Sequence, residues 1–169
     1  MKTKLFLLVM LFVFAVSVNA QTKAAAKDTK SFTIGAGVTL GLPTGDYTTM
    51  ESLAYGIDLM GEISVAKSFA ITVSAGYLDF AKKSGFSAAK LGLIPVLGGV
   101  KFGLSEKLYG SAQAGLSFST ASGGGSAFTY APGIGYKVSD KFDLLLKYQA
   151  ASKNSATNAF FGLRAGLTF

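Results

Sequence analysis

Several residue types that carry catalysis or metal binding are missing from this chain of 169 residues. It contains no cysteine, which excludes disulfides, thiolate metal sites and a lipid-bearing cysteine. It also contains no histidine, the commonest general base and metal ligand of proteins. Only 15% of the residues are charged and only three are proline. These absences argue against most hydrolytic and metal-dependent chemistry, and no cofactor is expected.

What the chain does have is apolar residues and glycine. Half of the residues are hydrophobic and 21 are glycine, which with so little proline favours closely packed or tightly turning strands over a disordered chain. The formal net charge of +7 could suggest a nucleic-acid partner. Without Lys2 and Lys4, however, 14 basic residues face 9 acidic ones, and the remaining +5 forms no continuous basic stripe. Nucleic acid is therefore not an expected partner.

The N-terminus predicts export. Residues 1–20 read as a signal peptide, with two early lysines, an apolar stretch over 5–16 and a small-x-small cleavage triplet at 18–20. The alternative is an uncleaved anchor, but the apolar stretch is short for the roughly 20 residues of a spanning helix. Residues 21–30 are small and polar and predict a flexible periplasmic lead-in, which leaves residues 31–169 as one domain.

Residues 31–169 alternate between apolar and small or polar side chains, the two-residue period of a β-strand. In the final stretch Phe161, Leu163, Ala165, Leu167 and Phe169 share one parity, opposite a glycine-rich polar set. The predicted strands are 31–42, 53–65, 69–77, 91–104, 108–118, 127–138, 142–148 and 159–169. The free edge of the last strand would be an aggregation hazard, so we expect it to pair with the first strand and close a barrel.

The connections support a barrel that spans a membrane. Long polar loops alternate with three-residue turns, each of which contains a lysine (Lys67, Lys107 and Lys141). Long outer loops and short periplasmic turns are typical of outer-membrane barrels, and the aromatic residues of the strands gather in two rings as interfacial girdles do. Pro95 predicts a bulge or a strand end within 91–104, and Pro132 a second irregularity.

We therefore predict an all-β fold, an eight-stranded antiparallel up-and-down transmembrane β-barrel. The alternative is a soluble sandwich or lipocalin-like barrel, whose apolar face would point inward. That alternative would expose a face of threonine, serine and glycine, with far less charge than soluble surfaces carry.

The chain resembles the outer-membrane β-barrel (porin-like) family of small eight-stranded barrels, similar to OmpX and the OmpA transmembrane domain. The resemblance rests on IPVLGGVKFGL (94–104), LYGSAQAGLSF (108–118) and FGLRAGLTF (161–169). It implies the outer membrane of a Gram-negative-type cell, outer-membrane lipid as surroundings and both termini in the periplasm. The terminal stretch resembles the signal read by the outer-membrane assembly machinery, which the resemblance assigns to Phe161, Leu163, Leu167 and Phe169.

Charges on the inward parity are the candidate functional residues. They are Asp58, Glu62, Lys101, Lys137, Asp143, Lys147 and Arg164. Eight strands enclose an interior that side chains can just fill, and buried charges there must pair. The favoured hypothesis is a salt-bridged, side-chain-filled lumen in a structural or surface-interaction protein whose long loops meet an unknown ligand. The alternative is a small porin-like channel for ions or very small solutes.

An enzyme is not predicted. Outer-membrane enzymes of the families that this architecture resembles generally use a histidine, and this chain has none. Asp46, Glu51 and Asp79 near the long loops could supply carboxylates, although isolated loop acids are usually only solvated. No metal-ligand spacing is present, and the three glycines at 123–125 lack the strand-to-helix context of a nucleotide site.

Overall fold

A computed structural model describes residues 31–45, 51–82, 92–121, 123–153 and 156–169. The predicted signal peptide (1–20) and lead-in (21–30) lie outside these residues. The strands are β1 (Phe32–Gly45), β2 (Glu51–Ala66), β3 (Phe69–Lys82), β4 (Gly92–Gly103), β5 (Leu108–Ser119), β6 (Ser126–Lys137), β7 (Phe142–Lys153) and β8 (Ala156–Thr168). Among the described residues no helix is long and apolar enough to cross a membrane.

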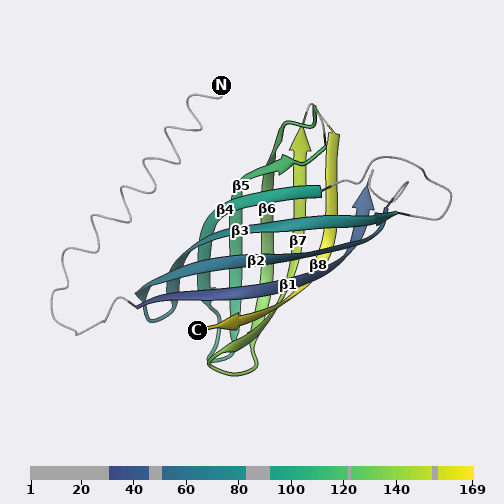
Figure 1. The fold of residues 1–169 in the computed structure, drawn as a ribbon. Helices are drawn as coiled ribbons and strands as arrows, with labels where there is room; N and C mark the ends of the chain where they lie inside the picture. Colours follow the sequence, from purple (N-terminus) through teal and green to yellow (C-terminus); the bar gives the residue numbers. More distant parts are fainter. Residues whose placement is uncertain (1–30, 46–50, 83–91, 122, 154–155) are drawn as a thin grey trace.

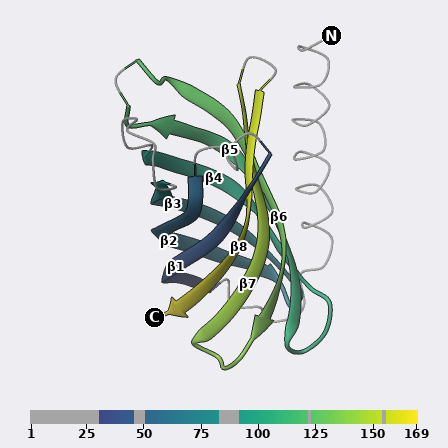
Figure 2. The same cartoon turned by 90° about the vertical axis from the view of Figure 1, so that its right-hand side faces the viewer.

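The eight strands form a closed barrel in which every neighbour is antiparallel. β1 pairs with β2 on one side and with β8 on the other, so the first and last strands close the sheet (Figures 1 and 2). Closure pairs the backbone groups that would otherwise form two free edges. The predicted fold, including the pairing of first and last strands, is confirmed.

The two faces of the sheet differ as the alternation predicts. On β1 and β2 the outward Val38 and Ile57 are 56% and 65% exposed, whereas the inward Thr39 is 2% exposed. The same pattern continues around the barrel and produces a broad belt of exposed leucine, isoleucine, valine and aromatic side chains. An apolar exterior around a polar interior suits hydrocarbon surroundings and is the reverse of the soluble alternative.

The interior contains one compact apolar cluster. It consists of Ala54, Leu78, Phe80, Leu93 and Phe160. The rings of Phe80 and Phe160 meet edge to face, with centroids 6.2 Å apart and planes at 78°. This cluster fills the end of the interior that faces the connections β1–β2 and β3–β4. The remainder holds buried polar side chains together with apolar ones such as Met60, Leu97 and Leu145.

The strands extend further than the apolar pattern predicts, and one connection is much shorter. The predicted loop over 151–157 is mostly strand, since Lys153 pairs with Ala156 across the chain reversal. The hydroxyls of Ser152 and Thr157 lie 2.9 Å apart beside it. Backbone ladders need no apolar side chains, so a strand can continue past the end of its hydrophobic stretch.

The expectation of a bulge or strand end at Pro95 is wrong. β4 runs through Pro95 with its register to β5 unbroken, and its pairing with β3 resumes in the same register beyond the proline. Each residue of an antiparallel strand bonds only one neighbour, so the missing N–H leaves a gap in the β3 ladder alone. Pro132 likewise interrupts pairing with β7 while it stays paired with β5. The true register shifts lie between β2 and β3, at Glu51/Leu53 and at Ser64/Ala66.

Candidate functional site

The interior charges gather around Arg164 of β8, which is 3% exposed. Its Nε lies 2.9 Å from both carboxylate oxygens of Asp58, and its Nη2 lies 2.8 Å from Asp58 Oδ1. Its Nη1 lies 3.8 Å from Asp143 Oδ1, an ion-pair distance on the opposite side of the guanidinium. A planar guanidinium with five donors can serve two carboxylates at once. Arg164 therefore links β2 and β7 along the inner side of the barrel wall.

Glycines on β1 and β8 make room for this arrangement. One cross-strand row runs from Asp58 through Gly37 and Gly166 to Asp143, so the two carboxylates are separated by two residues without side chains. A methyl group on Gly37 would overlap the Arg164 guanidinium, and one on Gly166 would overlap both the guanidinium and the Asp143 carboxylate. The glycines thus create the space in which Arg164 lies flat against the barrel wall.

A second ion pair continues the network toward the short turns. Lys101 Nζ lies 2.7 Å from Glu62 Oε2 and 4.7 Å from the centroid of the Tyr109 ring, a cation–π geometry. The Tyr109 hydroxyl in turn donates a hydrogen bond to Asp143 Oδ2. Tyr109 therefore links the Lys101–Glu62 pair to the carboxylate that faces Arg164, and the charges form one connected network.

The two remaining predicted charges, Lys147 and Lys137, lie in different surroundings. Lys147 is buried on β7, where its ammonium is attracted by the Asp58 carboxylate and repelled by the Arg164 guanidinium. Lys137 is exposed at the end of β6 and lines the mouth beside the short turns instead of the centre. Six of the seven predicted residues thus face the interior network, and Lys137 stands at its entrance.

Uncharged polar residues also form hydrogen bonds in the interior, and the sequence prediction, which considered only charged residues, did not include them. Gln113 Nε2 donates to Thr72 Oγ1 at 3.4 Å and to Ser74 Oγ at 3.2 Å. The Thr129 hydroxyl donates to Ser117 Oγ at 2.7 Å. The inward parity of these residues was the signal that could have identified them, because polar side chains on a filled interior need partners.

The interior is nearly closed at the ion-pair network. The cavity bounded by Arg164, Asp143, Lys101 and Glu62 has a volume of about 10 Å³. A single water needs about that much, so little free space remains beside the ion pairs. Wider spaces of about 200 Å³ and 90 Å³ lie at the mouth beside the short turns.

The other predicted positions lie away from this network. Asp79 accepts hydrogen bonds from the Tyr55 hydroxyl at 3.2 Å and from the Phe80 N–H at 2.8 Å. Glu51 is buried opposite Lys82 on β3, and Asp46 lies outside the described residues. Within the described part of the chain no three acidic residues gather as a metal site would require.

The residues assigned to assembly all lie on the outer face. Phe161, Leu163, Leu167 and Phe169 are between 47% and 72% exposed. The N–H of Phe169 donates to the carbonyl of Ile34 at 2.9 Å, which extends the β1–β8 seam to the last residue.

Comparison with known proteins agrees with this architecture. A family model described as the outer membrane protein beta-barrel domain matches residues 7–169. The structure resembles Ail, the attachment invasion locus protein of Yersinia pestis, with a TM-score of 0.57 and 16% identity over 83% of this chain and 99% of that one. It also resembles the N-terminal β-barrel domain of Pseudomonas aeruginosa OprF, with a TM-score of 0.57 and 13% identity over 80% and 97% of the two chains. A de novo designed transmembrane β-barrel matches with a TM-score of 0.52 and 20% identity over 81% and 95%. A search of curated protein sequences finds no match.

Proposed function

Because this chain belongs to the outer membrane protein beta-barrel family, we propose that it is a closed barrel with a structural or surface-interaction role. In this proposal the ion-paired interior seals the barrel against solutes, and function resides on its outer surfaces. The protein is exported by its signal peptide, is inserted by the outer-membrane assembly machinery and has both termini in the periplasm. It catalyses no reaction.

The observation that carries the proposal is the double engagement of Arg164 by Asp58 and Asp143. The three side chains come from β8, β2 and β7 and meet on the inner side of the wall that these strands form with β1, where the neighbouring cavity is about 10 Å³. Buried charges cost several kcal/mol each unless they are paired. Opening a path for ions would require these pairs to separate in a confined interior, so the closed state is the stable one.

Single-channel recording tests the proposal. Mature protein is refolded, its folding is verified by heat-shifted gel mobility, and it is inserted into a planar bilayer. We expect no discrete current steps from verified, inserted protein. Discrete, salt-dependent steps would instead support the alternative, a small porin-like channel for ions or very small solutes. In that case Arg164→Ala should change conductance or selectivity.

A further inference from the structure

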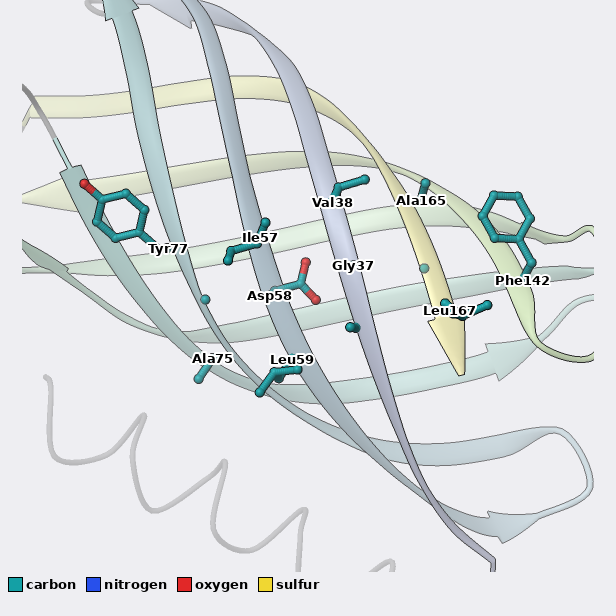
Figure 3. Close-up of a pocket in the computed structure, with 13 residues that line it drawn as sticks. Gly37, Val38, Ile57, Asp58, Leu59, Ala75, Tyr77, Phe142, Ala165 and Leu167 are labelled. Atoms are coloured by element: carbon teal, nitrogen blue, oxygen red, sulfur yellow. The ribbon is translucent and has the colours of Figure 1, made fainter. Parts of the chain in front are cut away.

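A second feature lies on the outer face of the barrel, on the other side of the wall from the Arg164 ion pairs. A hollow of about 670 Å³ crosses β3, β2, β1 and β8 and reaches β7. In Figure 3 Tyr77 stands at one end of it and Phe142 at the other. Its volume falls within the range of small-molecule binding sites.

The hollow arises from the side chains of two adjacent cross-strand rows. One row runs from Ala75 of β3 through Leu59 and Ala36 to β8, and the other contains Ala165. Alanine and leucine alternate along the first row, and in the second row Ala165 follows three larger residues, so the three alanines form a low floor between taller neighbours. Between the two rows lie inward-facing positions, three of them glycine, which add no bulk to the wall.

The chemistry of the hollow is that of a hydrocarbon site. Every outward-facing side chain that lines it is apolar except for the tyrosine hydroxyl at its end. Its one charged residue, Asp58, bonds inward to Arg164. The hollow is continuous with the exposed apolar belt, and Leu59 within it lies at the middle of β2. In a bilayer this depth is occupied by acyl chains and contains no water.

We propose that this hollow seats one acyl chain of a membrane lipid, held against the alanine floor between Tyr77 and Phe142. A flexible chain can follow a narrow hollow and contact its floor. The convex wall of a second barrel would touch the rim before it reached the floor. The lipid is therefore a bound component at one place on the barrel, distinct from the exchanging lipid around it. The proposal does not depend on whether the lumen conducts.

Native mass spectrometry of the refolded barrel in detergent, with added palmitoyl-oleoyl phosphatidylethanolamine, tests for the bound lipid. We expect one lipid per barrel to persist on the wild type. Ala36→Leu combined with Ala165→Leu fills the floor and should weaken binding about tenfold. Ala112→Leu combined with Ala114→Leu is the matched control, because these outward alanines lie on β5 away from the hollow. Heat-shifted mobility verifies that all three proteins are folded.

A reporter locates the lipid. The chain has no tryptophan, so Tyr77→Trp places a single one at the hollow, and Tyr130→Trp places one elsewhere on the exposed face. Phosphatidylcholine with a brominated acyl chain, added to the detergent-solubilised barrel, should quench the first tryptophan with saturation near one lipid per barrel. The second tryptophan should show only weak, unsaturated quenching.

Three results would overturn the proposal. The first is a wild-type barrel that retains no lipid while it is folded. The second is equal lipid retention by the filled variant and its control, or equal quenching of the two tryptophans. The third is a barrel dimer that the filled variant abolishes, which would assign the hollow to a second copy of the chain. None of these results bears on the current recordings, so the two proposals can fail separately.

Discussion

At the scale of single residues, Arg164 determines the charge balance of the interior. Two carboxylates face its guanidinium, and Asp58 makes the closer contacts. Removal of one partner from a buried ion pair leaves a charge without compensation, which costs more than the pair itself contributes. Substitution of Arg164 is consequently expected to destabilise the barrel.

Arg164→Met should lower the free energy of unfolding by about 3–5 kcal/mol, because Asp58 loses its hydrogen-bonded partner and keeps only the attraction of Lys147, and Asp143 keeps only its tyrosine partner. Adding Asp58→Asn should recover part of the loss by removing the stranded charge. Urea unfolding of the refolded barrel in lipid vesicles measures both effects. Lys141→Met, in an exposed turn, is the control and should unfold as the wild type does. Equal stability of Arg164→Met and wild type would show that the ion pairs of Arg164 do not stabilise the barrel.

Gly37 shows how a residue without a side chain shapes the same site. A methyl group at this position would overlap the Arg164 guanidinium, whereas one at Gly98 would meet no atom within 4 Å. Gly37→Ala should therefore destabilise the barrel by about 1–3 kcal/mol, the usual cost of overpacking. Gly98→Ala should be neutral or stabilising by up to about 1 kcal/mol, because alanine loses less backbone entropy in a strand. Urea midpoints of the two variants compare them directly, and a loss of the same size in both would refute the role of space at Gly37.

At the scale of the strand, depth in the membrane determines how much a charged substitution costs at an outward-facing position. Leu59 and Val65 both face outward on β2, at its middle and near its short-turn end. Leu59→Arg should cost about 2–4 kcal/mol and Val65→Arg about 0–1 kcal/mol, since the cost of a charge falls from the midplane to the interface. The comparison requires vesicle-refolded protein, because a detergent micelle imposes a weaker depth profile. Equal costs at both positions would contradict a membrane-spanning β2.

The strands also show what the sequence could and could not predict. Alternation assigned each side chain to a face, because the period of two is fixed by backbone geometry. It could not assign partners, since Asp58 and Arg164 are 106 residues apart and meet only through the register of the closed sheet. Strand ends were missed for a related reason. Near Lys153 and Ala156 the ladder continues through polar residues that carry no apolar signal.

Pro95 led to a wrong prediction because the effect of a proline on a sheet depends on the register of its strand. The missing N–H of Pro95 matters only toward β3, so β4 keeps its pairing with β5 and its direction. Which neighbour loses the bond depends on register, which no local pattern contains. The register shifts between β2 and β3 occur where the sequence has no proline, so proline could not have predicted them.

At the scale of the whole molecule, the β1–β8 seam makes one closed body from eight strands. Its last link is the hydrogen bond from the Phe169 N–H to the Ile34 carbonyl, while the Phe169 side chain is 72% exposed. That side chain contributes little to the interior. Two roles remain distinguishable for it, contact with lipid in the folded barrel and recognition during assembly.

Phe169→Ala separates these two roles when it is compared with Phe32→Ala. Phe32 is 62% exposed, faces outward and belongs to the neighbouring strand β1, so it provides a similar lipid contact without lying in the terminal stretch. Both variants should lose roughly 1–2 kcal/mol of stability after refolding in vesicles, from the lipid contact of one aromatic side chain. In cells, Phe169→Ala should strongly reduce the heat-modifiable barrel in the outer-membrane fraction, whereas Phe32→Ala should reduce it only slightly. Equal cellular levels at equal stability would show that the terminal aromatic acts through lipid contact alone, and the assembly role assigned to Phe161, Leu163, Leu167 and Phe169 would then lose its support.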